Sequence, residues 1–331
     1  MSDARSSSAT ATTGTADPGR PYRGRFAPTP SGPLHFGSLI AAVGSYLEAR
    51  TRDGEWLVRL EDLDPPRERP GAADAILGTL ERLELHWDGP VLRQSTRADA
   101  YQAALDRLAA AGLTFRCACS RAQLATLPEN QRRDPGDELF HPRGCLLPTV
   151  AGTSTACRFK VPDREIEFMD RVQGRQTANV ASSVGEFVLR RRDGWYAYQL
   201  AVVVDDAAQG VTDVVRGADL LASTPRQILL QEALGLPRLT YMHLPLAVDE
   251  SGLKLSKSDD APALSRESPA AQVVAALEFL RQAPPAGLGH ASPGEVWQWA
   301  TANWRPERFE GMTRGPVGGT SVRNAIQEDR Q

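Results

Sequence analysis

The chain has 331 residues and a formal net charge of −3, with 41% hydrophobic and 24% charged residues. This length is enough for about two domains, or for one large α/β domain with an insertion, and the composition is ordinary for a globular protein. The slightly negative charge excludes a generally basic nucleic-acid-binding protein, so any polyanion has to bind at local patches of charge.

Residues 1–22 are predicted to be a disordered tail, because the first twenty are mostly Ser, Thr, Ala and Gly without an apolar block. The longest aliphatic run, Leu200–Val204, is far too short to span a bilayer, so no membrane association is expected. Four unevenly spaced cysteines in a chain without an export signal indicate a cytoplasmic protein whose cysteines are thiols or metal ligands.

Strands and helices alternate in the first half of the chain. Arg23–Ala27 and Glu55–Leu60 are predicted strands, and the Pro- and Gly-rich segment Pro28–Pro33 between them is a loop. Helical spacing of apolar residues predicts three helices, at Leu39–Arg50, Ala72–Leu85 and Arg97–Ala111. This alternation is typical of an α/β fold with a mostly parallel sheet that is covered on both faces.

The alternation stops between about residues 115 and 193, where cysteines, a polar loop and short strand-like pieces predict an insertion. Strand and helix return with Tyr198–Val204 and Val211–Val215. A last strand is predicted at His243–Val248. A short helical region is expected over residues 266–310, with a helix near Gly294–Asn303, and residues 311–331 are predicted to be disordered.

One helix of the second half has well-marked ends in the sequence. Thr224 is its expected N-cap, Pro225 stands at the first helical position, and Gln227 would close a capping box. The helix is predicted to run through Leu234 and to end at Gly235.

The loop over residues 28–38 joins a predicted strand to a helix N-terminus and has the features of an anion site. Free N–H groups and the helix dipole attract phosphate there, Gly37 allows close approach, and His35 can donate to a phosphate oxygen. Only three of the 38 basic residues are lysines, and two of them, Lys254 and Lys257, lie in one short stretch. Lysine suits a phosphate that moves during a reaction, although a solvated turn also explains this pair.

His35–Ser38 and Lys254–Ser258 together resemble the HIGH and KMSKS signatures of class I aminoacyl-tRNA synthetases. The context RFAPTPSGPLH at Arg25–His35 is similar to the glutamyl branch, and the resemblance covers roughly residues 23–265. Ser38 replaces the second histidine of the first signature, and Leu255 replaces the methionine of the second. The implied fold is a Rossmann-type catalytic core in two halves, 23–114 and 194–265, with a zinc-containing, acceptor-binding-like insertion at 115–193.

The resemblance implies a ligase in which a carboxylate of the amino acid attacks the α-phosphate of ATP and pyrophosphate leaves. Catalysis would then be positioning and charge stabilisation, with His35, Lys254 and Lys257 as the expected catalytic residues. Mg²⁺ is expected to accompany ATP. The residues expected to bind ATP are Pro28, His35, Gly37, Ser38 and Lys257.

A glutamate site needs arginines for two carboxylates and one carboxylate for an ammonium group. By match to the glutamyl family, Glu61 would hold the α-ammonium group, and Arg25, Tyr198 and Arg216 would hold the carboxylates. Ligands of open α/β sheets bind at the carboxyl ends of strands. Taken singly, each residue is equally well explained by a structural ion pair. The expected glutamate site comprises Arg25, Phe26, Ala27, Pro28, Thr29, Glu61, Tyr198 and Arg216.

Three thiols and one imidazole form a second constellation. Cys117 and Cys119 are followed, after a long loop, by His141 and Cys145, and this donor set suits one structural, tetrahedral Zn²⁺ ion. His141 stands where glutamyl-type synthetases carry an aromatic or polar residue four positions before a final cysteine. Cys157 is the alternative fourth ligand, and unliganded thiols are the alternative to a metal site.

Only 73 residues follow Ser258, too few for the helical anticodon-binding domain of a full glutamyl-tRNA synthetase, so no such domain is expected. The chain most resembles the short members of the family, which activate L-glutamate without tRNA and transfer it to queuosine in the anticodon of tRNA(Asp). A monomer is expected. The alternatives are a truncated enzyme charging the 3′ end of tRNA(Glu), an adenylyltransferase acting on a small metabolite, and a non-catalytic tRNA-binding paralogue.

Overall fold

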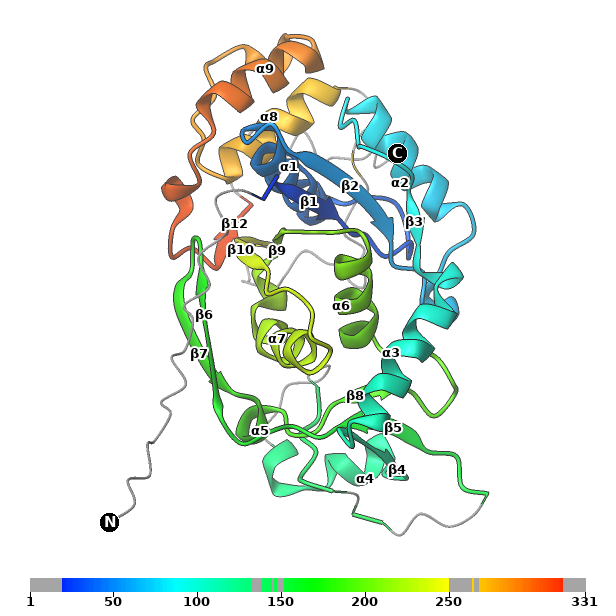
Figure 1. The fold of residues 1–331 in the computed structure, drawn as a ribbon. Coiled ribbons are helices and arrows are strands. Elements are labelled where there is room, and N and C mark those ends of the chain that lie inside the picture. Colours follow the sequence, from blue (N-terminus) through cyan, green and yellow to red (C-terminus); the bar gives the residue numbers. More distant parts are fainter. Residues whose placement is uncertain are drawn as a thin grey trace, which may run out of the picture.

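The computed structural model describes residues 20–131, 138–144, 146–147, 152–249, 264 and 268–317. Its centre is a sheet that begins with three parallel strands, β1 (Arg23–Phe26), β2 (Glu55–Leu60) and β3 (Leu92–Arg93) (Figure 1). Within the described ranges, no helix combines the length and the apolar character that crossing a membrane requires.

A second group of strands continues this layer. Its order is β7-β6-β10-β9, and β6, β10 and β9 are parallel. The N–H of Thr212 donates to the carbonyl of Arg23 at 2.9 Å, which places the beginning of β9 beside β1. The bounds of these strands are β6 (Glu165–Asp170), β7 (Gly174–Asn179), β9 (Asp213–Gly217) and β10 (Thr240–Leu244).

Both faces of the central sheet are buried. Val214 and Val215 are neighbours in β9, and their side chains belong to two different apolar clusters. Tyr241 and Met242 of β10 divide in the same way. Because successive side chains of a strand point to opposite faces, the two clusters cover the two sides of one sheet. The predicted α/β architecture is therefore confirmed.

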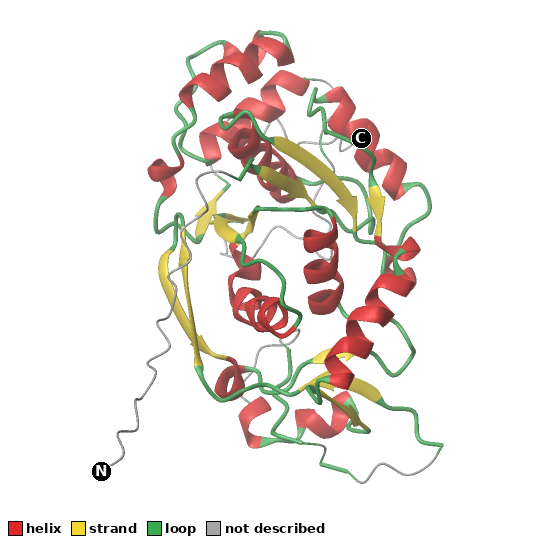
Figure 2. Cartoon of the chain, in the orientation of Figure 1, coloured by secondary structure: helices red, strands yellow, loops and turns green. Residues whose placement is uncertain are grey.

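Helices on both sides of the sheet supply much of both clusters (Figure 2). On one side of the sheet are α1 (Phe36–Arg50), α2 (Ala72–Arg82), α8 (Pro269–Phe279) and α9 (Pro293–Asn303). On the other side are α3 (Ala98–Ala110), α6 (Tyr198–Ala208) and α7 (Thr224–Ala233). The predicted helices at 39–50, 72–85, 97–111 and 294–303 all form, with ends that differ by up to three residues.

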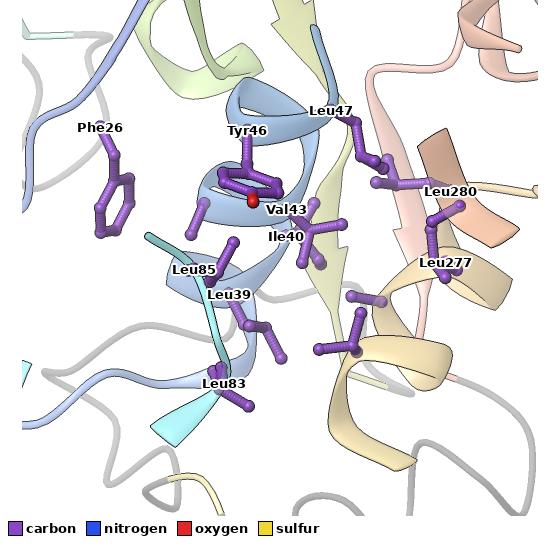
Figure 3. Packing of buried hydrophobic residues seen from close by; sticks show 14 of the residues in the cluster. Phe26, Leu39, Ile40, Val43, Tyr46, Leu47, Leu83, Leu85, Leu277 and Leu280 are labelled. Atoms are coloured by element: carbon purple, nitrogen blue, oxygen red, sulfur yellow. The ribbon is translucent and has the colours of Figure 1, made fainter. Parts of the chain in front are cut away.

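Helix α1 lies at the centre of the first cluster (Figure 3). Its apolar side chains pack between Phe26 of β1 and Leu277 of α8, which joins the beginning of the chain to its helical C-terminal region. Gly44 of α1 faces Leu244 of β10, and a Cβ at this glycine would lie 2.5 Å from the Leu244 Cδ1 atom. This close approach fixes the distance between α1 and the sheet, and therefore the place of the helix N-terminus.

The predicted insertion forms a small antiparallel sheet, β4-β5-β8, at the end of the molecule opposite α8 and α9 (Figure 1). The hairpin β6–β7, which also lies in this segment, extends from there to the central sheet, where Asp170 pairs with Tyr241 of β10. The insertion is therefore continuous with the central sheet. Its other elements are β4 (Thr114–Cys117), α4 (Arg121–Ala125), β5 (Ala156–Phe159), α5 (Val180–Ser183) and β8 (Val188–Arg190).

Several local predictions need correction. Helix α7 begins at Thr224, one residue earlier than predicted, so its N-cap is Ser223, and no side chain caps it. The expected capping box does not form, because the Thr224 hydroxyl instead accepts a hydrogen bond from Arg216 at 2.9 Å and Gln227 donates to Gln199 at 3.0 Å. Tertiary partners thus replace the local ones. Of the predicted strand and helix at Tyr198–Val204 and Val211–Val215, the first segment is the beginning of helix α6 and the second overlaps strand β9.

The end of the predicted last strand also differs. Pro245 has no N–H for a ladder and separates β10 from a second short strand, β11 (Leu246–Val248). Arg314–Pro316, predicted to be disordered, forms β12 and pairs with β11. Tyr22, which the sequence placed in the tail, is buried in the first cluster.

Candidate active site and metal cluster

A cavity of about 310 Å³ lies at the carboxyl ends of β1, β2, β9 and β10, next to the N-terminus of α1. It brings together all the described residues that the sequence predicted to bind ATP or glutamate. Lys254 and Lys257 lie outside the described residues. The predicted residues that line the cavity are Arg25, Phe26, Ala27, Pro28, Thr29, His35, Gly37, Ser38, Glu61, Tyr198 and Arg216.

The N-terminus of α1 forms one wall. His35 is the N-cap residue in an extended conformation, and its side chain makes no capping hydrogen bond, so the imidazole is directed elsewhere. The Ser38 hydroxyl lies 3.0 Å from His35 Nε2. Ser38, which replaces the second histidine of the signature, thus contacts the first. The N–H groups of the first helical turn make this wall suitable for an anion.

Arg25, at the end of β1, is held from behind by a buried carboxylate. Its Nε donates to Asp206 Oδ1 at 3.0 Å and its Nη2 to Asp206 Oδ2 at 3.4 Å. Arg59 Nη1 donates to the same Oδ1 at 2.7 Å. Burial acts to raise the pKa of Asp206, but the charges and hydrogen bonds of the two arginines outweigh it and lower the pKa. Asp206 is therefore ionised between two guanidinium groups.

Glu61 follows β2 and is fixed by both the backbone and a charge. Its N–H donates to the carbonyl of Pro28 at 3.0 Å, which ties it to the loop after β1. One of its carboxylate oxygens lies 3.6 Å from Arg59 Nη2, and its side chain is 12% exposed. Burial raises the pKa of Glu61, against the opposing charges of Arg59 and Arg25. The carboxylate lies at the cavity wall and can accept hydrogen bonds from a cationic ligand.

Arg216, near the end of β9, has most of its donors occupied. Nη1 donates to the hydroxyl of Tyr198 at 3.3 Å. Nη2 donates to Thr224 Oγ1 at 2.9 Å and to the carbonyl of Leu220 at 3.4 Å. Nε donates to His243 Nε2 at 3.0 Å. Within the described part of the chain, the second Nη1 hydrogen has no partner, so it remains for a ligand. Arg25 and Arg216 thus supply positive charge to a cavity that also contains the carboxylate of Glu61.

The predicted metal ligands Cys117, Cys119 and His141 are buried, and their ligand atoms lie within 4.8 Å of one another. The Cys117 Sγ lies 3.1 Å from His141 Nε2. His141 Nδ1 lies 2.7 Å from the carbonyl oxygen of Pro142, so Nδ1 carries the proton and Nε2 presents a lone pair to the thiols. Burial, with the charge of Arg158, lowers the pKa of His141 to about 4. The donor set fits a thiolate- and imidazole-binding metal ion.

Cys145 lies outside the described residues, so its place as fourth ligand stays a prediction. The alternative, Cys157, pairs with Arg116 across β4 and β5. Its side chain is therefore on the opposite face of this sheet from Cys117, and it packs against the second apolar cluster. Gly185 supports the His141 loop, because it has φ of +71° and a Cβ there would come within 1.8 Å of the His141 carbonyl oxygen.

The fold and the cavity define the catalytic core of a class I aminoacyl-tRNA synthetase. Residues 22–282 match the family described as tRNA synthetases class I (E and Q), catalytic domain. The chain belongs to this family and, within it, to the glutamyl-Q tRNA(Asp) synthetases.

It is 56% identical over 285 residues to the glutamyl-Q tRNA(Asp) synthetase of Dechloromonas aromatica (strain RCB), covering 86% of this chain and 94% of that protein. It is 53% identical to that of Pseudomonas aeruginosa (strain LESB58), covering 87% of this chain and 95% of that protein. Among solved structures, it is similar to a glutamate tRNA ligase from Elizabethkingia meningosepticum in complex with its amino acid. That match has a TM-score of 0.74 and 25% identity, and covers 92% of this chain and 68% of the other.

Sequence patterns did not identify the groups that hold the ligand-facing arginines. Two pairs of buried side chains support these arginines. Asp206 contacts Arg25 and is itself contacted by Arg59, and His243 contacts Arg216 and is itself contacted by Asp170. The signal for Asp206 was a pair of carboxylates after an apolar run, and for His243 a polar residue at the start of a predicted strand. Both signals indicate a buried polar network, but neither indicates its partners.

Proposed function

We propose that the chain activates L-glutamate with ATP as glutamyl-adenylate and transfers the glutamate to queuosine in the anticodon of tRNA(Asp). The observation that supports this most is that one cavity is lined by Arg25, Glu61 and Arg216 together with the N-terminus of α1. Two arginines and one carboxylate complement a ligand with two carboxylates and one ammonium group. The anion-binding turn beside them suits the phosphates of ATP.

The proposed roles of the cavity residues follow their charges. Glu61 accepts the α-ammonium group of glutamate, and Arg25, Tyr198 and Arg216 bind its carboxylates. Phe26, Ala27 and Thr29 complete this part of the wall. His35, Gly37 and Ser38, with Pro28, bind the ATP phosphates.

Activation needs no side-chain nucleophile. An oxygen of the glutamate α-carboxylate forms a bond to the α-phosphorus, the bond from that phosphorus to the bridging oxygen breaks, and pyrophosphate leaves. Lys254 and Lys257, assigned from sequence, would stabilise the leaving pyrophosphate together with His35. Mg²⁺ would accompany ATP and neutralise part of its phosphate charge. A hydroxyl of queuosine then attacks the carbonyl carbon, and AMP leaves.

The name of the similar proteins, glutamyl-Q tRNA(Asp) synthetase, supports tRNA(Asp) as the acceptor. We further propose a division into catalytic halves at residues 23–114 and 194–265, an insertion at 115–193 that faces the RNA, and a helical region at 266–310. In this proposal the enzyme acts as a monomer in the cytoplasm.

We also propose that Cys117, Cys119 and His141 bind one structural Zn²⁺ ion, with Cys145 as the fourth ligand. A neutral imidazole whose Nδ1–H donates to a backbone carbonyl supports this assignment. The ion would hold the His141 loop to β4, which lies at the end of the molecule opposite α8 and α9 (Figure 1). It would take no part in the adenylation step.

The activity is tested in two assays on the full chain. Glutamate-dependent exchange of pyrophosphate into ATP, without tRNA, measures activation. Transfer of labelled glutamate to tRNA(Asp) with and without queuosine, and to tRNA(Glu), identifies the acceptor. Labelling only of queuosine-containing tRNA(Asp) is expected. Labelling of tRNA(Glu), or equal labelling of both forms of tRNA(Asp), would contradict the proposed acceptor, and absence of exchange with glutamate would contradict the activation step.

A substitution in the cavity tests the amino-acid site. Arg216→Gln is expected to raise the KM for glutamate at least about tenfold while the KM for ATP changes little, because a charge-assisted hydrogen bond contributes roughly 1.5–3 kcal/mol. Arg226→Gln, an equally buried arginine outside the cavity, is the matched control. An unchanged KM for glutamate in Arg216→Gln would refute this assignment.

A further inference from the structure

Behind the cavity, Arg216 ends a buried chain of polar groups. Arg216 in β9 and His243 in β10 are directly paired in register, so their side chains lie on the same face of the sheet. Arg216 Nε and His243 Nε2 are 3.0 Å apart, and His243 Nδ1 and Asp170 Oδ2 are 2.6 Å apart. Three strands, β9, β10 and β6, thus contribute one residue each to a continuous series of contacts. His243 does not line the cavity.

The chemistry of the arginine assigns the protons. A guanidinium group has only donors, so His243 Nε2 has to accept, and its proton is on Nδ1. That Nδ1–H donates to Asp170. The other Asp170 oxygen accepts the N–H groups of Val172 at 3.1 Å and Gln173 at 2.9 Å. The carboxylate is therefore fixed by the backbone and in turn fixes the histidine tautomer that can hold Arg216.

Burial and the charge of Arg216 keep His243 neutral. Burial lowers its pKa, the hydrogen bond to Asp170 acts in the opposite direction, and the positive charge of Arg216 lowers the pKa further. For Asp170, burial acts to raise the pKa, but the hydrogen bond from His243 and those from the backbone outweigh it. The side chains of His243 and Asp170 are both 0% exposed. If His243 were protonated, its Nε2–H would face the N–H donor of Arg216 Nε. Burial and the charge of Arg216 both oppose this protonation.

Further contacts restrict the plane of the guanidinium group. Thr224 Oγ1 accepts from Arg216 Nη2 and lies 3.3 Å from His243 Nε2. The Arg216 Cζ lies 5.8 Å from the centroid of the Tyr241 ring, and that ring is stacked on His243. With Nε and Nη2 held in this way, Nη1 is the remaining group, and it donates to the hydroxyl of Tyr198, which lines the cavity. The polar chain thus decides which edge of Arg216 is available to a ligand.

We propose that His243, held in one tautomer by Asp170, is a positioning residue that orients Arg216 toward a carboxylate of glutamate. The inference rests on the proposed binding of glutamate by Arg216. It assigns to His243 an effect on glutamate binding through Arg216, without contact with the substrate. Its loss would therefore raise the KM for glutamate and leave the KM for ATP unchanged.

Two substitutions at one position separate the two hydrogen bonds of His243. In His243→Gln, the terminal amide occupies the place of Nε2 and can accept from Arg216, but the donor to Asp170 is lost. In His243→Asn, the amide occupies the place of Nδ1 and keeps Asp170, but the acceptor for Arg216 is lost. We expect His243→Asn to raise the KM for glutamate at least about tenfold, the effect of one hydrogen bond to a charged group. We expect His243→Gln to raise it less than about threefold.

Asp170→Asn provides a second test through the tautomer. The amide NH₂ of the new side chain would face His243 Nδ1 and favour the proton on Nε2, where it opposes Arg216. We expect Asp170→Asn alone to raise the KM for glutamate. When Asp170→Asn is added to His243→Gln, we expect no increase above the KM of His243→Gln. Tyr241→Phe is the control, since its hydroxyl contacts Gln231 at 2.9 Å and no polar atom of Arg216.

All variants are compared by glutamate-dependent pyrophosphate exchange, with thermal unfolding to show that each is folded. If His243→Asn and His243→Gln have equal KM values for glutamate, or if the KM values for ATP and glutamate rise together, the positioning role is wrong. If the unmodified enzyme shows no exchange with glutamate, the proposed function fails instead. The two failures are therefore distinguishable.

Discussion

Asp206→Asn tests whether a buried carboxylate holds the arginines at the cavity. Asp206 is 4% exposed and accepts hydrogen bonds from Arg25 and Arg59, which are 3% and 0% exposed. Asparagine has nearly the same size, so the substitution leaves no cavity and isolates the effect of the charge. It removes one negative charge between two guanidinium groups and turns an NH₂ group toward one of them.

The expected effect is large because all three groups are buried. Removing one partner of a buried ion pair costs about 3–5 kcal/mol, since the other charge stays desolvated without compensation. Typical proteins have a total stability of about 5–15 kcal/mol. Because Glu61, 3.6 Å from Arg59 Nη2, compensates part of the charge of Arg59, the lower end of the range is the better expectation. We therefore expect a loss of about 3 kcal/mol in the free energy of unfolding.

The assay is denaturant unfolding of Asp206→Asn against the unmodified protein, followed by the KM for glutamate in folded material. Arg25 loses its support from behind, so that KM should also rise. Glu167→Gln is the matched control, since Glu167 and Arg175 form an exposed ion pair in the β6–β7 hairpin. A loss below about 1 kcal/mol in Asp206→Asn, the range of exposed pairs, would refute the idea that this carboxylate compensates two buried charges.

Three further predictions concern the metal, the joint between the core and the C-terminal region, and acid. Cys117→Ser should reduce bound zinc from one equivalent to none in atomic absorption, whereas Cys157→Ser should retain it. Glu48→Gln should lower the free energy of unfolding by about 1.5–3 kcal/mol in denaturant titration, because the buried Glu48 carboxylate joins two arginines and the Trp304 indole. The pKa of Asp206 is lower in the folded chain than its unfolded value of about 3.9. The ionised Asp206 side chain therefore stabilises the fold fully above about pH 3.9, and this contribution is lost as the pH falls from there through the folded pKa. Stability curves at several pH values should therefore show a shallower acid slope in Asp206→Asn.

Local patterns predicted the central elements because these elements depend on local properties. The Pro- and Gly-rich loop cannot be regular structure, and α1 has apolar residues at helical spacing, so both were predicted from the sequence. The errors arose where contacts with another element determine the local structure. Thr224 has the chemistry of an N-cap, but its hydroxyl contacts Arg216, which comes eight residues earlier in the chain on another element. Arg314–Pro316 has no strand pattern and becomes β12 because the unpaired edge of β11 lies beside it.

The same distinction applies to the candidate site. The residues that face the cavity were predictable, because they follow strands and match a family motif. Their supporting groups were not, since Asp206 lies 181 residues from Arg25, and Asp170 lies 73 residues from His243. No spacing rule connects such pairs. They meet only when the parallel strands are placed in order and register.

The supporting groups explain how charged side chains can be held in place in the wall of the cavity. A lone arginine in an apolar wall would have many rotamers and a high desolvation cost. Here Asp206 occupies two donors of Arg25, and His243 occupies Nε of Arg216, so each guanidinium group presents a fixed edge to the cavity. Of these two supporting side chains, Asp206 is charged and His243 is neutral. Asp206 therefore compensates the charge of its arginine, while His243 leaves the charge of Arg216 available to a carboxylate, and this difference predicts that Arg216 attracts the ligand more strongly than Arg25.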